Sequence, residues 1–183
     1  EELEDGTLEI TGYTWDDTEL VIPAEIDGKR VTRIGEQAFD YYRSLTSIKL
    51  PAGLTSIGGY AFADCSSLSN IELPSSLTSI GSDAFRSCIS LENIELPSSL
   101  TSIGSDAFEY CSSLTSIELP SGLTSIGDGA FCGCISLTKI IVNKDNPNYI
   151  SQDGILYNKD QKELICCPGG KKGKIVIPES VVS

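Results

Sequence analysis

Histidine is absent from the 183 residues of the chain. This absence removes the Ser-His and Cys-His pairs that activate nucleophiles, and it removes the commonest metal ligand. The sequence also lacks a phosphate-binding glycine loop, an EF-hand loop and a dinucleotide-binding fingerprint. Carboxylates are plentiful, but none is distinguished by its position. We therefore predict that the chain is not an enzyme and that it holds no cofactor.

Basic residues are scarce, because 13 Lys and Arg stand against 26 Asp and Glu and leave a net charge of −13. Nucleic-acid binding draws its affinity from clustered basic side chains that release counterions, so nucleic acid is not an expected partner. The bases are also unevenly placed: ten acids precede the first base, Lys29, and seven bases lie between Lys139 and Lys174. We expect the acidic N-terminal end to serve solubility and end-capping, with electrostatic steering of a basic partner as the alternative.

Long apolar runs are missing too. No stretch approaches the roughly 18 residues needed to cross a bilayer, so no transmembrane segment is expected. The sequence begins with Glu1 and has no charged-then-apolar leader. A secretion signal would have been removed or would lie outside this sequence, so its absence here carries no information.

What the chain does have is a 23-residue repeat, present four times between residues 45 and 136. With the first Leu of each copy as position zero, every copy has Ile at 3, Leu at 5, Pro at 6, Leu at 9, Ile at 12, Gly at 13, Ala-Phe at 16 and 17, and Cys at 20. A fixed period of this length is the mark of a leucine-rich repeat solenoid, in which each repeat buries its apolar face only against its neighbours. We predict a mainly β, right-handed stack of 23-residue coils.

Each repeat contains an Ile-x-Leu-Pro stretch with the two-residue period of a strand, which should end at the Pro because Pro cannot donate to a ladder. The expected strands are 47–50, 70–73, 93–96 and 116–119, paired in one parallel sheet. A second extended piece, Leu-Thr-Ser-Ile, precedes the Gly. Ser82 and Ser105 are then placed to cap one or two helical turns, α or 3₁₀, that contain the Ala-Phe pair and the Cys.

The N-terminal segment, 1–44, predicts a cap followed by a divergent first repeat. Alternating residues at 7–11 indicate a strand, and a turn is expected around Asp27. Tyr13 and Trp15 are expected to cover the end of the core.

The C-terminal segment departs from the frame after Leu137. Residues 137–174 predict an irregular repeat with an inserted β-hairpin, whose strands lie near 154–157 and 163–166. Residues 175–183 restart the frame as a truncated further repeat, from which we expect the parent protein to continue beyond Ser183. We assign the whole chain, 1–183, to one domain.

Seven cysteines fall into two groups. Four of them recur at 23-residue spacing, namely Cys65, Cys88, Cys111 and Cys134. We interpret these four as small buried residues in a ladder, with disulfides between neighbouring coils as the alternative. The other three, Cys132, Cys166 and Cys167, lie outside the frame. Free thiols are the leading expectation; a disulfide from Cys132 to Cys166 or Cys167 and a four-thiolate zinc site with Cys134 are the alternatives, the zinc site having unusual spacing.

The outward-facing strand position varies between repeats and is the first candidate binding surface. It carries Lys49, Glu72, Glu95, Glu118 and Ile141. Because consecutive coils place such residues about 4.8 Å apart, the three glutamates should be directly opposed, which costs stability. Repeat duplication with solvated Glu side chains is the simpler interpretation. The functional one is a polar surface for a basic segment of a partner or a cation, formed by the three glutamates with Asn70, Asn93 and Ser116 beside them.

The second candidate surface is basic and belongs to the predicted hairpin. Its members are Lys159, Lys162, Lys171, Lys172 and Lys174. Insertions that interrupt repeats often project from one face, so these lysines could bind an anionic surface or a glycan. A structural insertion with a solvated Gly-Gly-Lys-Lys-Gly turn is an equally good interpretation.

The string Leu-Thr-Ser-Ile-x-Leu-Pro-Ser-x-Leu-Thr-Ser-Ile-Gly-x-x-Ala-Phe-x-x-Cys resembles the BspA-like class of bacterial leucine-rich repeats, and the likeness covers nearly the whole chain. The segments 13–18, 26–31 and 154–159 also resemble stretches common in that class. The resemblance implies a secreted or surface-attached bacterial protein that binds host matrix proteins, other proteins or cell-surface molecules. It brings no catalytic residues. The alternative is a spacer solenoid that presents another domain of a larger protein.

Overall fold

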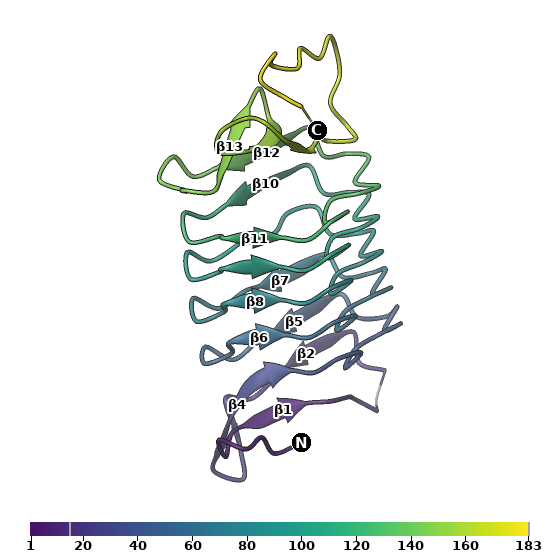
Figure 1. Cartoon of the computed structure of the whole chain (residues 1–183). Coiled ribbons are helices and arrows are strands. Elements are labelled where there is room, and N and C mark those ends of the chain that lie inside the picture. Colours follow the sequence, from purple (N-terminus) through teal and green to yellow (C-terminus); the bar gives the residue numbers. More distant parts are fainter. Residues whose placement is uncertain (15, 183) are drawn as a thin grey trace.

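The computed structural model describes residues 1–14 and 16–182, and within them every regular element is a β-strand. The chain winds as a stack of coils along one axis, with its first strands at one end and its C-terminal sheet at the other (Figure 1). The strands are β1 (Leu8–Ile10), β2 (Glu19–Val21), β3 (Glu25–Ile26), β4 (Lys29–Ile34), β5 (Ser47–Lys49), β6 (Ser56–Ile57), β7 (Asn70–Glu72), β8 (Ser79–Ile80), β9 (Ser102–Ile103), β10 (Ser116–Leu119), β11 (Ser125–Ile126), β12 (Lys139–Val142), β13 (Tyr149–Gln152), β14 (Ile155–Asn158) and β15 (Leu164–Cys166). The solenoid expected from the period is confirmed.

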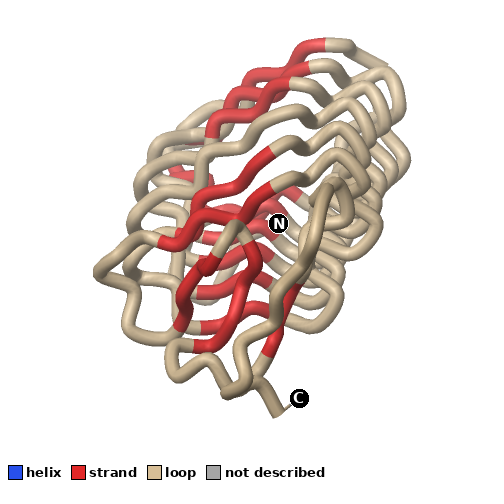
Figure 2. Tube along the Cα trace, turned by 90° about the horizontal axis from the view of Figure 1, so that it is seen from above, coloured by secondary structure: helices blue, strands red, loops and turns tan. Residues whose placement is uncertain are grey.

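Two walls of parallel strands run along the stack. One wall is continuous and has the order β1-β4-β6-β8-β9-β11, with Ser-Ile pairs of successive coils in register. The other wall has two parts, β2-β5-β7 and β10-β12. Seen from above, strand segments recur at corresponding places of successive coils (Figure 2). Each coil therefore contributes one short strand to each wall, except where the second wall is interrupted.

The core between the walls consists of the invariant apolar positions of the repeat. The five Phe rings form a column, with centroids 5.3, 5.4, 5.4 and 5.8 Å apart and planes within 10° of parallel. Tyr13 closes the N-terminal end of this column, because its ring lies 6.4 Å from that of Phe39 and 6.2 Å from that of Tyr42. The capping role expected for Tyr13 is confirmed, whereas Trp15 and Ser183 lie outside the described residues.

The segment expected to be helical forms consecutive turns instead. In each regular coil the residues at positions 15 and 19 have positive φ, as in Asp106 (55°) and Tyr110 (57°). Alternate amides then donate to the next coil: Asp106 N–H to Asp128 O at 2.9 Å and Phe108 N–H to Ala130 O at 2.8 Å. An α-helix would need those amides for bonds within its own segment. The helix prediction, with Ser82 and Ser105 as its caps, is wrong because pairing between coils takes half of the donors.

The buried cysteines also join neighbouring coils. Each thiol donates to the Phe carbonyl of the preceding coil at 3.0–3.2 Å, as Cys111 Sγ does to Phe85 O. Burial raises the pKa of Cys65 and of Cys134 to about 12, so these thiols stay protonated and remain donors at neutral pH. All seven cysteines are free thiols, and neither alternative disulfide is present.

The irregular ends agree with the sequence in outline. The strand expected at 7–11 is β1, and the turn around Asp27 joins the antiparallel strands β3 and β4, with φ of 52° at Asp27 and 75° at Gly28. The C-terminal insertion is a three-stranded antiparallel sheet, β13-β14-β15, so one strand, β13, was missed. In the described part of the chain, no helix has the length and apolar character to span a membrane.

Candidate partner-binding surfaces

The second wall presents the residues that the sequence singled out. We define the acidic face as Asn70, Glu72, Asn93, Glu95, Ser116 and Glu118. The three Glu side chains are exposed, and none of them makes an ion pair among the described residues. Lys49 stands opposite Glu72 in the β5–β7 register, and Ile141 stands opposite Glu118 in the β10–β12 register.

Three hollows follow one another along the acidic face. A hollow of about 270 Å³ lies over β2, β5 and β7 and includes Lys49 and Glu72. The next, of about 450 Å³, lies between Glu72 and Glu95, and the third, of about 520 Å³, lies between Glu95 and Glu118. The structure thus brings Lys49 and all six residues of the acidic face to the lining of one interrupted trough.

The two larger hollows border a gap in the second wall. Residues 93–96 were expected to be a strand but form none, and none of their amides donates a backbone hydrogen bond to a described residue. The coil is held just before the gap, where Thr115 N–H donates to Glu92 O at 3.2 Å, and just after it, where Ser99 Oγ–H donates to Leu77 O at 2.6 Å. The expectation that Glu72, Glu95 and Glu118 lie directly opposite one another on paired strands is therefore wrong, because residues 93–96 do not pair with either neighbouring strand.

Three of the five lysines of the basic candidate surface are bonded to other residues of the insertion. The ammonium groups of Lys159 and Lys171 donate to the backbone carbonyls of Asn146 and Asp153. Lys162 is 3.4 Å from the carboxylate of Asp160. These three lysines are therefore engaged within the insertion.

The two remaining hairpin lysines, Lys172 and Lys174, are exposed. Lys174 shares a hollow of about 270 Å³ with Lys171 and Asp153.

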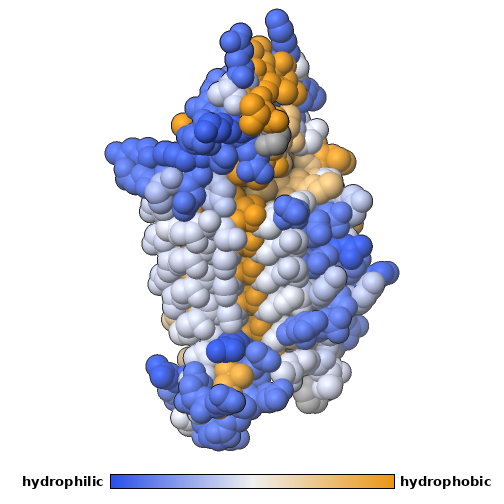
Figure 3. All heavy atoms as spheres, in the orientation of Figure 1, coloured by the Kyte–Doolittle hydropathy of each residue, from blue (hydrophilic) through white to orange (hydrophobic). Residues whose placement is uncertain are grey.

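Strongly hydrophilic groups gather at both ends of the molecule, while the face over β6, β8 and β11 is weakly polar around a narrow apolar stripe (Figure 3).

The off-frame cysteines gather near the last regular coil. Burial raises the pKa of Cys166 to about 11, with a smaller effect from Cys167, which weakens both its nucleophilicity and its metal affinity at neutral pH. No set of three or more Cys, Asp or Glu side chains in the described ranges is arranged to hold a metal ion.

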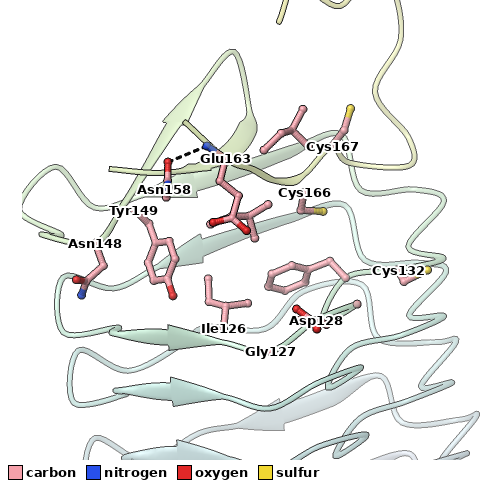
Figure 4. Close-up of a pocket in the computed structure, with 15 residues that line it drawn as sticks. Ile126, Gly127, Asp128, Cys132, Asn148, Tyr149, Asn158, Glu163, Cys166 and Cys167 are labelled. Carbon is pink, nitrogen blue, oxygen red and sulfur yellow. Dashed lines mark hydrogen bonds between the residues drawn. The ribbon is translucent and has the colours of Figure 1, made fainter. Parts of the chain in front are cut away.

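A further hollow, which sequence reasoning missed, separates the last regular coil from the C-terminal sheet. This C-terminal groove has a volume of about 670 Å³ and is lined by residues 126–132 on one side and by 148–149, 158 and 163–167 on the other. Tyr149 and the Glu163 carboxylate point into it, and Glu163 N–H donates to Asn158 Oδ1 at 3.1 Å (Figure 4). The sequence held one signal for this groove, the break in the repeat frame after Leu137. The coil that follows does not repeat the Ile-Gly-x-x-Ala-Phe turn, so it leaves space beside the last regular coil.

Comparison with known proteins identifies the repeat. The pattern of the BspA type leucine rich repeat region matches residues 32–159 in six copies. No curated protein matches the chain.

Several solved bacterial structures share the fold. A leucine rich repeat protein of T. pallidum is 38% identical, with a TM-score of 0.76 over 76% of this chain and 66% of that one. A leucine-rich repeat protein of Eubacterium ventriosum is 28% identical, with a TM-score of 0.80 over 96% and 48%. A leucine rich cell surface protein of Faecalibacterium prausnitzii is 28% identical, with a TM-score of 0.57 over 98% and 62%.

This chain therefore spans from about half to about two thirds of the length of these proteins. The shared coil, the shared core positions and the match over residues 32–159 point to one conclusion: the chain belongs to the BspA-type leucine-rich repeat family.

Proposed function

We propose that the chain is a non-enzymatic interaction or adhesion module of a secreted or cell-surface bacterial protein, and that its partner contacts the acidic face. Repeat proteins of this kind generally bind through extended surfaces rather than perform chemistry. The F. prausnitzii relative is described as a cell surface protein, which supports the same location for this chain. The partner is a host or matrix protein or another cell-surface molecule.

The observation that carries this proposal is the exposed charge over an open wall. Glu72, Glu95 and Glu118 contribute nothing to the core, and they line hollows of about 450 and 520 Å³. Like charges gathered on one face repel one another, so the presence of three glutamates on a surface that could be neutral favours a binding role. A basic segment of a partner fits this face best, because complementary charge steers association and fixes orientation.

A binding screen tests the proposal directly. The chain, immobilised at one end, is exposed to matrix proteins and cell-surface glycans while bound mass is recorded. We expect saturable binding to at least one basic partner, with affinity that falls as salt rises because exposed charges are screened. Absence of saturable binding across the panel would favour the alternative, a spacer solenoid that presents another domain of a larger protein.

A further inference from the structure

The outward position of the second wall forms a row that continues beyond the acidic face at both ends. Its strands follow one another along the stack (Figure 1), and pairing of β2 with β5, of β5 with β7 and of β10 with β12 keeps the position in register. We define the outward row as Val21, Lys49, Glu72, Glu95, Glu118 and Ile141. All six side chains are exposed, including the apolar ones, Val21 at 71% and Ile141 at 39%. In chain order the outward row is therefore apolar, basic, acidic three times, and apolar.

The three hollows of the second wall link the members of the outward row. The hollow of about 270 Å³ is lined by the first three members, the hollow of about 450 Å³ by the third and fourth, and the hollow of about 520 Å³ by the last three. Neighbouring hollows share Glu72 or Glu95. A ligand that lies along the solenoid axis can therefore contact all six side chains in succession.

The gap at residues 93–96 adds backbone acceptors to the two larger hollows. The carbonyl groups of these four residues accept no hydrogen bond from any described residue. Leu73 contributes apolar lining to the hollow of about 450 Å³, and Leu96 does so in the hollow of about 520 Å³. A Lys side chain has three donors on its ammonium group and an apolar stem. It can bond carboxylates and a carbonyl together in these hollows, while its stem packs on leucine.

The spacing of the outward row matches an α-helix better than an extended strand. Adjacent paired strands lie about 4.8 Å apart, so the five steps of the outward row cover about 24 Å at that spacing. The two steps beside Glu95 show no ladder bonds among the described residues, so they are not held to it. A helix presents one residue per turn at intervals of about 5.4 Å, and five turns cover about 27 Å. A strand presents alternate residues about 6.7 Å apart, and five such steps cover about 33 Å.

We propose that the outward row docks an amphipathic α-helix of the partner, laid along the solenoid axis. This inference rests on the function proposed above and specifies the structure of the partner segment. The helix has one stripe of apolar, acidic, basic, basic, basic and apolar residues, spaced alternately four and three residues apart. Its apolar residues contact Val21 and Ile141, its acid pairs with Lys49, and its three bases face the three glutamates. Residues at one-turn spacing act as anchors in this mode of recognition.

The first test titrates two peptides of identical composition against the full chain and records fluorescence anisotropy. The stripe peptide is an Ala-rich helix of about 20 residues, long enough to form in water, and it has the six stripe residues in the order and spacing given above. The alternating peptide has the same six residues at every second position, so they share a face only when the peptide is extended. We expect the stripe peptide to bind at least tenfold more tightly and to gain helix on binding, measured by far-UV circular dichroism.

The second test fixes the register of the helix by a charge exchange. Glu95→Lys should weaken binding of the stripe peptide at least tenfold. A stripe peptide with Glu in place of its middle base should bind this variant at least tenfold more tightly than it binds the wild type. Glu36→Lys, at an exposed acid outside the second wall, is the control and should change affinity within twofold. The titrations use about 0.15 M salt, which screens exposed charges more than about 8 Å apart.

Three results would overturn docking of a helix on the outward row. Equal affinity for the two peptides would mean that charge alone is recognised, and tighter binding of the alternating peptide would mean that an extended segment is. Failure of the charge exchange to restore binding would place the helix away from Glu95. Binding of neither peptide would also exclude the helix, whereas the proposed function would then depend on the separate screen of matrix proteins and glycans.

Discussion

At the scale of single residues, the invariant glycine of the repeat is fixed by distance between coils. A Cβ built on Gly81, Gly104 or Gly127 would lie 2.2–2.6 Å from backbone atoms of the preceding coil. Backbone cannot move aside as a flexible side chain can, so any larger residue would separate two coils that share ladder bonds. The glycine is required by close approach and not by an unusual φ.

The residue-scale prediction is that Gly104→Ala destabilises the chain by about 2 to 4 kcal/mol, in the range of overpacked cores. Gly53→Ala is the matched control, because nothing lies within 4 Å of a Cβ at Gly53, and its effect should stay within about 0.5 kcal/mol. Urea unfolding of both variants gives the comparison. Equal stability of the two would show that the coils are not in contact at this glycine.

For the repeated cysteines, the sequence predicted burial but not hydrogen bonding. A fixed spacing and a small apolar side chain correctly predicted burial of Cys65, Cys88 and Cys111. The donation of each thiol to the preceding Phe carbonyl could not be predicted, because it depends on the displacement between coils and not on the pattern within one.

At the scale of elements, two identical stretches of the chain differ in secondary structure, which shows that tertiary surroundings and not local sequence decide whether the strand forms. Residues 70–85 and 93–108 are identical in sequence. The first stretch begins with strand β7, whereas the second has no strand at 93–96. Propensity is the same in both, so the difference comes from their neighbours. Glu72 faces Lys49 on one side, while Glu95 lies between Glu72 and Glu118.

The element-scale prediction follows from this charge arrangement. If residues 93–96 paired with a neighbouring strand, Glu95 would meet a like charge at a cost of about 0.2 to 1 kcal/mol, so Glu95→Gln should favour that pairing. Exchange of the Ile94 and Leu96 amides should then slow by roughly two- to fivefold. Glu92→Gln, an exposed acid outside the row, is the control. If the amides of both variants exchange like the wild type, charge is not the cause of the gap.

The same reasoning explains which elements could be predicted from the sequence. The strands at β5, β7 and β10 and the hairpin strands β14 and β15 follow from residue alternation and turn residues. The helix prediction failed because alternate amides in the Ala-Phe turn are used between coils, a fact that no single repeat contains. The C-terminal groove was missed for a similar reason, since it exists only where one coil has no successor of its own kind.

At the scale of the whole molecule, the positions that fill the core differ from those of the proposed binding surface. The invariant Leu, Ile, Phe and Cys residues fill one continuous core, and the acidic face lies outside it. The residues of the acidic face could be named from the sequence because their outward position follows from the strand period. Its division into hollows could not be predicted, because that depends on the opening of the second wall.

The measurement that tests this account most directly pairs partner binding with thermal unfolding of one triple variant, Glu72→Gln, Glu95→Gln and Glu118→Gln. The control triple has the same charge change at exposed acids away from the acidic face: Glu4→Gln, Glu36→Gln and Glu179→Gln. We predict at least a tenfold loss of affinity for the first triple, with its unfolding temperature unchanged or higher, and a change within twofold for the control. Equal affinities for the two triples would contradict a binding role of the acidic face.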